Sequence, residues 1–285
     1  MIPAPFDYVV ADSAGNAIEL LAKREDAKLL AGGHSLLPAM KLRLARPALL
    51  IDVGRIGDLS YVREDGDAIA IGALTRHKDV AESSLLHEHC PIVSTVAGQV
   101  GDPQVRHRGT IGGSLAHGDP ASDLPSVVLA LGAELVARRS KGERTIAATE
   151  FFTGVFTTAL EPDEMLTEIR VPKLGSSGWS YVKMNRRAQD WATVGVAAVV
   201  ERSNGSVGKA AIALTNMGAT SLRAAASEDA LAGGASVEEA AALAADGTEP
   251  PSDHAASSDF RRHLVRVLTR RALEEAARGG SMRDG

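Results

Sequence analysis

One stretch, RHRGTIGGSLAHGDPASDLP at residues 106–125, constrains the fold more than any other part of this sequence. Its glycines carry no side chain, so the main chain can come close to a ligand there. The hydroxyls of Thr110 and Ser114 stand beside consecutive backbone N–H groups, and such groups form a concave nest that suits a phosphate. We therefore predict an anion-binding loop whose contacts are Thr110, Ile111, Gly112, Gly113 and Ser114. The alternative is a glycine-rich turn that only joins two elements.

A helix is expected to follow this loop. The apolar run Val127–Leu131 begins just after Asp119 and Asp123. The positive end of its dipole would then point back toward the loop, where it would favour an anion.

A second glycine motif, AGGHSLL at residues 31–37, lies where a strand gives way to a helix. The pattern predicts a strand over Ala27–Ala31 and a short helix around Leu37–Leu44. Backbone donors can gather at the start of this helix too. Gly32 and Gly33 could instead form only a tight turn, and we interpret His34 as a hydrogen-bonded turn residue rather than a catalyst.

The remaining pattern predicts a mixed α/β region, a linker of composition KLGSSG at residues 173–178, and a second domain of α+β type. The other predicted strands are Phe6–Val10, Ala48–Val53, Ala68–Leu74, Ala133–Arg139, Arg144–Ala148, Glu164–Val171, Trp179–Asn185, Gly195–Glu201 and Val207–Leu214. The other predicted helices are a helix capped by Asp12 or Ser13 and ending at Arg24, then Ser84–Val100, Leu222–Ala232, Val237–Ala245 and Phe260–Ala277. On the last helix we expect a solvated basic face formed by Arg261, Arg262, Arg266, Arg270 and Arg271. Residues Gly279–Gly285 are expected to fray.

Composition excludes several classes of function. A net charge of −5 gives no basic footprint for nucleic acid. No apolar run is long enough to cross a bilayer, and Met1 is not followed by a charged and then apolar leader. We therefore predict a cytoplasmic protein that binds no nucleic acid and has no membrane span.

The cysteine count limits the metal chemistry. Cys90 is the only cysteine, so this chain cannot supply a four-thiolate iron–sulfur or zinc site. His87, His89 and Cys90 could bind a metal at short spacing, but no second cluster completes a ligand shell. We interpret them as helix-surface residues and predict no metal.

Together, AGGHSLLPAMK and RGTIGGSLAHGDPASDLP resemble the FAD-binding medium subunit of the molybdenum hydroxylases, the xanthine dehydrogenase and carbon monoxide dehydrogenase medium-subunit family. The likeness is greatest to the carbon monoxide dehydrogenase branch. It covers the whole chain, from MIPAPFDY through SYVKMNRRAQDWATVGVAAVV to ATSLRAAASEDALAG. His107, Gly118 and Ser122 depart from residues that are common in the family, without removing a backbone donor.

This resemblance implies a fold. We expect a two-lobed FAD-binding domain of the PCMH type, like that of vanillyl-alcohol oxidase, over residues 1–172, with lobes at about 1–57 and 58–172. An α+β C-terminal domain of the carbon monoxide dehydrogenase flavoprotein type is expected over residues 173–285. FAD would lie extended between the two lobes.

The resemblance also implies how the residues contact the cofactor. The first lobe would hold the FAD pyrophosphate and ribitol through Gly32, Gly33, His34, Ser35 and Leu36, and the second through Thr110, Ile111, Gly112, Gly113 and Ser114. Asp123 would accept from a ribose hydroxyl, and Leu166 would pack near the adenine. Lys183 would reach the flavin, and Trp191 would lie beside its ring. No side chain is assigned a catalytic role.

The implied function is electron transfer within a complex. A large subunit with the molybdopterin cofactor would oxidise the substrate, and a small subunit with two [2Fe–2S] clusters would pass electrons to this FAD. The acceptor would be quinone, NAD or oxygen, in a hetero-oligomer such as a dimer of heterotrimers that could sit at the inner face of the membrane. The alternatives are the medium subunit of an aldehyde, purine or N-heterocycle dehydrogenase and, from another class, a stand-alone FAD-dependent oxidase.

Overall fold

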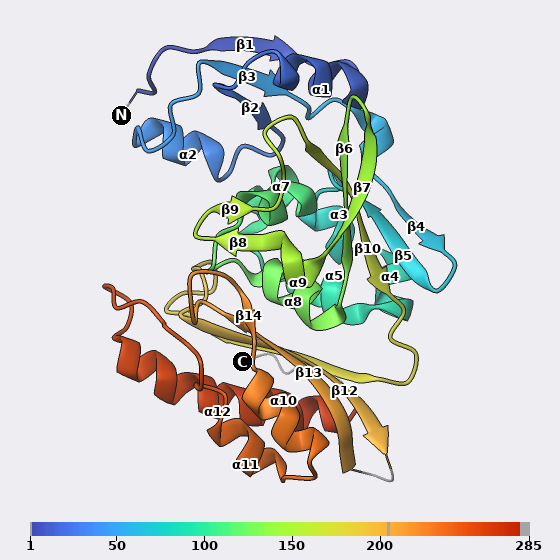
Figure 1. Ribbon diagram of the computed structural model, residues 1–285, viewed down its shortest axis with the longest axis vertical. Coiled ribbons are helices and arrows are strands. Elements are labelled where there is room, and N and C mark those ends of the chain that lie inside the picture. Colours follow the sequence, from blue (N-terminus) through green and yellow to red (C-terminus); the bar gives the residue numbers. More distant parts are fainter. Residues whose placement is uncertain (1, 204–205, 280–285) are drawn as a thin grey trace.

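Among the described residues, the three larger sheets, each with its own helices, follow one another along the chain and along the long axis of the molecule (Figure 1). The structure is a computed structural model that describes residues 2–203 and 206–279. The first sheet belongs to a small N-terminal lobe, the second to a larger central lobe, and the third to a C-terminal domain.

The first lobe is a parallel three-stranded sheet of order β1-β3-β2. Ser13 caps the first helix by accepting a hydrogen bond from the Asn16 backbone N–H, and the helix buries Ala17 and Ile18 against Ile51 of the central strand. The elements are β1 (Asp7–Val10), α1 (Ala14–Ala22), β2 (Ala27–Leu30), α2 (Leu36–Lys41) and β3 (Leu49–Asp52). The predicted strand–helix–strand order is therefore present, with the glycine motif between β2 and α2.

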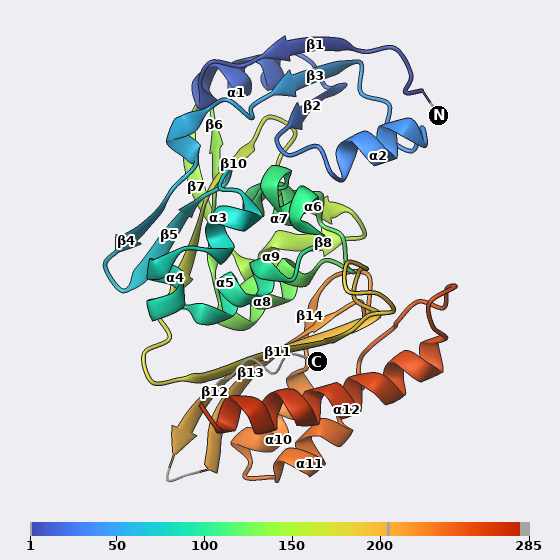
Figure 2. The same ribbon diagram turned by 180° about the vertical axis from the view of Figure 1, so that it is seen from behind.

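The second lobe is an antiparallel five-stranded sheet of order β4-β5-β10-β6-β7 with helices on one side (Figure 2). Its strands are β4 (Val62–Asp65), β5 (Ala68–Gly72), β6 (Glu134–Arg139), β7 (Gly142–Ala147) and β10 (Met165–Pro172), with a separate hairpin of β8 (Phe152–Gly154) and β9 (Thr157–Thr158). Its helices are the 3-10 helix η1 (Gly57–Leu59) and α3 (His77–Ala81), α4 (Ser84–His89), α5 (Pro91–Gly98), α6 (Pro103–Arg108), α7 (Ile111–His117), α8 (Asp123–Leu131) and α9 (Ala148–Phe151).

The stretch at residues 106–125 is mostly helical rather than a loop. It contains the end of α6, all of α7 and the start of α8. Two caps explain this: Asp102 accepts from the Val105 N–H before α6, and Thr110 accepts from the Gly113 N–H before α7. The glycines of the motif were read as loop formers, although two of them lie inside the first turn of a capped helix.

The predicted helix over Ser84–Val100 is two helices, α4 and α5. Pro91 is the first residue of α5, because proline lacks an N–H and is tolerated at that position but not in a helix interior. Cys90 lies at the break and is fully buried, so reading it as a helix-surface residue was wrong. Burial raises the pKa of its thiol to about 12. Among the described residues, no group of three or more histidine, cysteine or acidic side chains is placed to hold a metal ion.

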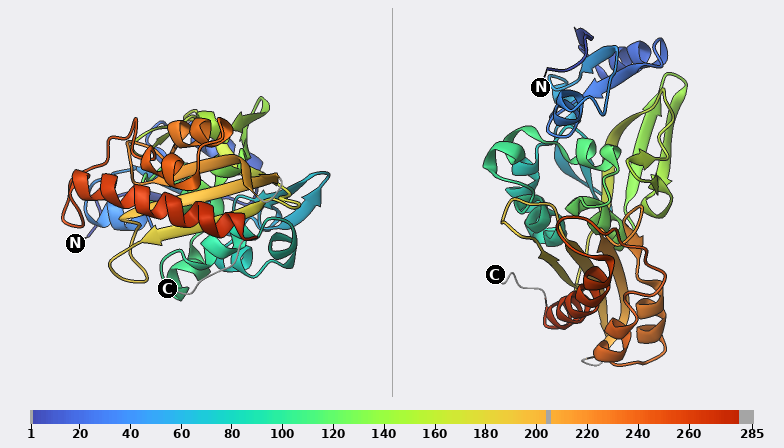
Figure 3. Two further views of the ribbon diagram at one scale, coloured as in Figure 1. Left: turned by 90° about the horizontal axis from the view of Figure 1, so that it is seen from below. Right: turned by 90° about the vertical axis from the view of Figure 1, so that its left-hand side faces the viewer.

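The C-terminal domain is an antiparallel four-stranded sheet of order β11-β12-β13-β14. Residues alternate along β12: Val196 and Ala198 face the core beneath the helices, whereas Ala197 joins the core of the second lobe. Helix α12 lies across the sheet (Figure 3). The elements are β11 (Gly178–Met184), β12 (Val194–Ser203), β13 (Ser206–Thr215), β14 (Leu222–Arg223), α10 (Ala225–Ala232), α11 (Val237–Ala242) and α12 (Ser258–Ala277).

Two further expectations concern the end of the chain. Arg261 is fully buried, so the basic face predicted on α12 does not include it, whereas Arg266, Arg270 and Arg271 are exposed. Of the predicted frayed tail only Gly279 is described, and the rest lies outside the described residues. No helix in the described ranges combines the length and the apolar character needed to cross a membrane.

Candidate functional site

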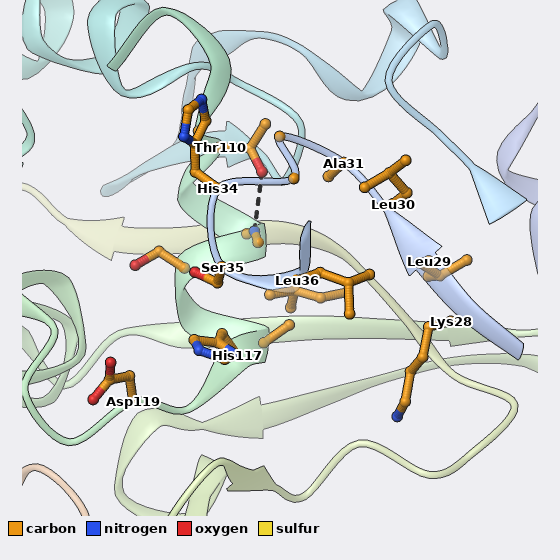
Figure 4. A pocket seen from close by; sticks show the side chains of 18 of the residues that line it. Lys28, Leu29, Leu30, Ala31, His34, Ser35, Leu36, Thr110, His117 and Asp119 are labelled. Atoms are coloured by element: carbon orange, nitrogen blue, oxygen red, sulfur yellow. Dashed lines mark hydrogen bonds between the residues drawn. The ribbon is translucent and has the colours of Figure 1, made fainter. Parts of the chain in front are cut away.

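A cavity of about 770 Å³ lies between the first and second lobes and extends to the loop that carries Trp191. Its volume is in the range of pockets that hold small molecules and cofactors. The first lobe contributes β2 and the turn before α2, and the second lobe contributes α7, the turn after it, β9 and the start of β10. Figure 4 shows Lys28 and Asp119 on opposite sides of the site, with Ser35 and Leu36 between them.

The turn between β2 and α2 presents unpaired backbone donors. Among the described residues, none of the N–H groups from Gly32 to Leu36 has a protein acceptor, whereas the next one, that of Leu37, donates to the Gly33 carbonyl. These five N–H groups belong to residues that all line the cavity. Consecutive free donors at a helix start are the arrangement that binds phosphate groups.

Two glycines make this turn possible. Gly33 has φ +78°, a conformation that other residues rarely adopt. A Cβ on Gly32 would meet the Arg108 carbonyl oxygen and lie 2.7 Å from the Gly109 Cα. Gly32 is therefore the place where the backbones of the two lobes touch.

The donors of the second glycine motif are used within the protein. The N–H groups of Ile111 and Gly112 donate to the Thr75 and Ala73 carbonyls, at 3.0 and 2.9 Å. The Gly113 N–H donates to Thr110 Oγ1 at 3.1 Å, as the dashed line in Figure 4 shows, and the Ser114 N–H donates to the Thr110 carbonyl. The expected nest of free donors is thus found in the first motif, and the second motif forms a capped helix that faces the cavity.

One arginine and one histidine lie close to the nest. Arg76 donates to the Arg108 carbonyl, and burial lowers the pKa of its guanidinium. His77 lines the cavity, is nearly fully buried, and has no hydrogen-bond partner for Nδ1. Burial, together with Arg106 and Arg76, lowers the pKa of His77 to about 4, so its imidazole is neutral at physiological pH.

Aromatic side chains gather near Asp119. The His117 ring packs against Phe156 with 5.0 Å between centroids, and burial lowers the pKa of His117. Phe156 has φ +54°, an unusual conformation for a large residue, at the tip between β8 and β9. The Trp191 indole Nε1 donates to Asp119 Oδ2 at 2.8 Å.

Asp123 forms a buried cluster with two residues of β11. Its carboxylate accepts from the Tyr181 hydroxyl at 2.6 Å and from Lys183 Nζ at 2.9 Å. Burial raises the pKa of Tyr181, which keeps the phenol protonated as a donor. The side chains of Asp123 and Lys183 are both more than nine-tenths buried. This cluster joins the cavity wall to the C-terminal domain.

The cavity brings together all the predicted cofactor residues except two. Ile111 is buried in the core of the second lobe, and Lys183 is bound to Asp123 behind the wall. The predicted residues that line the cavity are Gly32, Gly33, His34, Ser35, Leu36, Thr110, Gly112, Gly113, Ser114, Asp123, Leu166 and Trp191.

Three residues of the site were not found from the sequence: His77, Phe156 and Tyr181. His77 follows a strand end in GALTRH, which gives no sign that its ring is buried. The signal for Tyr181 was its alternation with Lys183 on one strand, which places both on the face toward the second lobe.

The cavity and its walls define a class of protein. A row of free N–H groups with one arginine nearby suits a diphosphate in the middle of the site, and apolar and aromatic walls beside it suit flat rings. This is the arrangement of a protein that binds a dinucleotide cofactor in extended form.

Comparison with known proteins identifies the particular family. Residues 4–174 match the model of the FAD binding domain in molybdopterin dehydrogenase, and residues 179–276 match that of the CO dehydrogenase flavoprotein C-terminal domain. The chain belongs to this family of FAD-binding subunits, as its sequence motifs predicted.

Relatives match over nearly the whole chain. The chain is 43% identical to the carbon monoxide dehydrogenase medium chain of Hydrogenophaga pseudoflava, covering 97% of this chain and 98% of that one. It is 38% identical to the 6-hydroxypseudooxynicotine dehydrogenase complex subunit alpha of Paenarthrobacter nicotinovorans, covering 97% and 96%. A solved structure of carbon monoxide dehydrogenase from Hydrogenophaga pseudoflava, which lacks the Mo-pyranopterin moiety of its cofactor, superimposes with a TM-score of 0.94 at 44% identity and covers 99% and 100% of the two chains. The predicted fold, an FAD-binding domain followed by a flavoprotein C-terminal domain, is confirmed.

Proposed function

We propose that this chain is the FAD-carrying electron-transfer subunit of a molybdenum hydroxylase of the carbon monoxide dehydrogenase type. The observation that carries the proposal is the row of unpaired N–H groups at Gly32–Leu36, inside a cavity between the lobes of a domain that belongs to this FAD-binding family. The full-length similarity to a carbon monoxide dehydrogenase medium chain supports the type of complex.

The residues of the cavity fit FAD. The N–H groups of Gly32–Leu36 would hold its diphosphate, and Arg76, which donates to the Arg108 carbonyl beside Gly32, would add positive charge near it. Leu166 offers an apolar wall for the adenine, and Trp191 offers a ring beside the flavin. Bound there, FAD supplies the capacity to take up two electrons and pass them on.

The protein binds, orients and shields the cofactor. The neutral His77 adds no charge beside the nest, and the tilted rings of His117 and Phe156 form part of the cavity wall. The Asp123 cluster fixes the wall by tying it to β11 of the C-terminal domain. These are roles of placement, and no side chain of this chain is required as an acid, base or nucleophile.

The single cysteine of this chain indicates that iron–sulfur clusters must come from partner subunits. One thiolate cannot hold the iron–sulfur clusters that connect a flavin to a distant oxidation site. We propose a small [2Fe–2S] subunit and a large molybdopterin-binding subunit, assembled as a dimer of heterotrimers, with quinone, NAD or oxygen as acceptor. A stable interface with the small subunit would bury at least about 1,200 Å².

Reduction by substrate tests this proposal. The chain is expressed alone and together with its two partners, and the bleaching of the flavin absorbance is followed after addition of carbon monoxide. We expect the chain alone to bind FAD and stay oxidised, and the complex to be reduced. Rapid reduction of the lone chain would instead identify a self-sufficient oxidase.

The second candidate is the medium subunit of an aldehyde, purine or N-heterocycle dehydrogenase. The similarity to a subunit of the 6-hydroxypseudooxynicotine dehydrogenase complex supports this second candidate. The substrate pocket would lie on the large subunit in either case. Testing the complex with aldehydes and N-heterocycles as well as carbon monoxide separates the two.

A further inference from the structure

Trp191 reaches the cavity from the other domain. It lies in the connection between β11 and β12, residues 185–193, and together with Asp190 it lines a cavity whose other described lining residues belong to the two lobes. Its side chain is 56% exposed although it faces the site, so it stands where the cavity opens to solvent. Because the ring is so exposed, few packing contacts fix its orientation.

The backbone that follows Trp191 is held firmly. Asn216 Nδ2 donates to the Ala192 carbonyl at 2.8 Å, and the buried Arg261 donates to the Thr193 carbonyl. The Thr193 N–H donates to the Met184 carbonyl at 2.7 Å and closes the connection. The freedom left to Trp191 is therefore mainly that of its side-chain torsions.

The acceptor of the indole is also held. Asp119 Oδ1 accepts from the Ala121 N–H at 2.9 Å, which leaves Oδ2 for the indole Nε1. The Asn216 N–H donates to the Pro120 carbonyl at 2.8 Å, so the turn that contains Asp119 is tied to the same domain as Trp191. One side-chain hydrogen bond of 2.8 Å thus connects two fixed backbones across the opening.

We propose that Asp119 is a positioning residue that holds the Trp191 indole over the opening of the cavity, and that this bond limits how fast an electron acceptor reaches the flavin. The proposal rests on the proposed function. Asp119 acts through Trp191 and takes no part in the electron transfer itself. The rings of His117 and Phe156, tilted by 40° to each other, also line the cavity, and Phe156 is more than half exposed.

The reaction in question is the oxidation of the reduced flavin. Two electrons and two protons leave the reduced cofactor, and they convert oxygen to hydrogen peroxide or a quinone to its hydroquinone. A bulky acceptor needs a wider opening than oxygen does. A loosened indole should therefore speed oxidation by a quinone more than oxidation by oxygen.

The first measurement is made on the chain without FAD. Trp179 and Trp191 are the two tryptophans, so Trp179→Phe leaves one reporter. In this background, Asp119→Ala should increase the amplitude of fast motion in the time-resolved fluorescence anisotropy of Trp191. Asp119→Asn has a single oxygen for the two donors, the Ala121 N–H and the indole, and should give a motion between those of Asp119→Ala and the parent. Equal anisotropy decays in all three proteins would overturn the proposal.

The second measurement is made on the FAD-loaded chain after reduction with dithionite. In Asp119→Ala the hydrogen bond is lost, so a larger fraction of the molecules should have the Trp191 ring turned away from the opening. The rate of flavin oxidation by a water-soluble quinone should then rise by about three- to tenfold. Trp191→Phe, which keeps a ring but loses the donor, should give a similar increase, and Asp119→Asn should give a smaller one. FAD content and the unfolding temperature are measured for each variant. Unchanged quinone rates in variants that retain FAD would disprove the positioning role, whereas a parent chain that binds no FAD would disprove the proposed function instead.

Discussion

At the scale of single residues, the site depends on two glycines, Gly32 and Gly33. Gly32 has no Cβ, and one placed there would meet the Arg108 carbonyl and the Gly109 Cα of the other lobe. Gly33 holds φ +78° next to it. The two positions form the nest for different reasons, close approach and backbone conformation.

Gly32→Ala is therefore expected to weaken FAD binding. Forcing an atom into packed backbone costs about 1–3 kcal/mol, which corresponds to a roughly 5- to 150-fold rise in the dissociation constant. Titration of the apo-protein with FAD, followed by flavin fluorescence, measures it. Gly15→Ala, where a Cβ meets nothing within 4 Å, is the matched control. Equal affinity in both variants would show that the lobes separate there without cost.

His77 makes a prediction about pH. Its pKa is about 4 in the folded chain, below the ordinary value of 6.5, because burial disfavours the charged ring and Arg106, Arg76 and His34 repel it. As the pH falls below 6.5 the unfolded chain takes up a proton that the folded chain does not, so stability is lost toward acid. Between pH 7 and pH 5 this residue should lower the free energy of unfolding by about 2 kcal/mol.

Urea unfolding of the apo-protein at the two pH values tests this prediction. The loss on going from pH 7 to pH 5 should be smaller in His77→Gln than in the parent by the amount attributed to His77. An identical pH dependence in the two proteins would mean that His77 binds its proton equally well in the folded and unfolded states.

At the scale of elements, the sequence predicted the strands better than the helices around the site. Alternating and continuous apolar runs placed β2, β3, β5, β6 and β10 within a residue or two, because each strand is defined by its own pattern. The helices α6 and α7 were missed because they are short and glycine-containing, and capping by Asp102 and Thr110 decides them. Burial of Arg261 was missed because its partners Asp253 and Thr193 come from other elements.

In helix α7, Gly112 has a role other than the one that its motif suggests. A Cβ on Gly112 would lie 2.5 Å from the Ala73 Cβ, so this glycine lets α7 pack on the residue that follows β5. Its substitution therefore tests packing and not only the approach of a phosphate.

We expect Gly112→Ala to destabilise the chain by about 1–3 kcal/mol even without FAD. Gly98→Ala in α5 is the control, because the nearest atom to its Cβ would be the Ala81 Cβ at an ordinary 3.8 Å. Thermal unfolding of the two apo-proteins should separate them by several degrees. If Gly112→Ala unfolds at the same temperature as the parent but no longer binds FAD, then Gly112 serves only ligand binding.

At the scale of the whole molecule, the C-terminal domain is part of the site. Tyr181 and Lys183 of β11 bind Asp123 at the start of α8. Trp191 of the 185–193 connection binds Asp119, and Asn216, which follows β13, binds Pro120, so the turn between α7 and α8 is held by the C-terminal domain. Sequence reasoning placed Asp123, Lys183 and Trp191 near the cofactor through family resemblance. It could not show that Lys183 and Asp123 bind each other, because they are sixty residues apart in the chain.

Breaking the ion pair of Lys183 and Asp123 should destabilise the contact between the second lobe and the C-terminal domain. Lys183→Met leaves the Asp123 carboxylate buried without its cation, which typically costs about 3–5 kcal/mol. The double variant with Asp123→Asn removes the stranded charge and should recover a large part of that loss. Urea unfolding of the two single variants, the double variant and the parent gives the coupling energy. Additive losses would show that the two side chains act independently.

The unpaired N–H groups of Gly32–Leu36 have a consequence for amide hydrogen exchange. Without ligand these five amides have no protein acceptor, so they should exchange rapidly with deuterated solvent. The amides of Ile111–Ser114 donate within the protein and should exchange slowly from the start. Adding FAD should slow the first group and leave the second almost unchanged. The apo-protein would thus carry a short deuterium-labelled segment that marks where the cofactor's phosphates bind, and equal protection of both segments before FAD is added would refute the assignment.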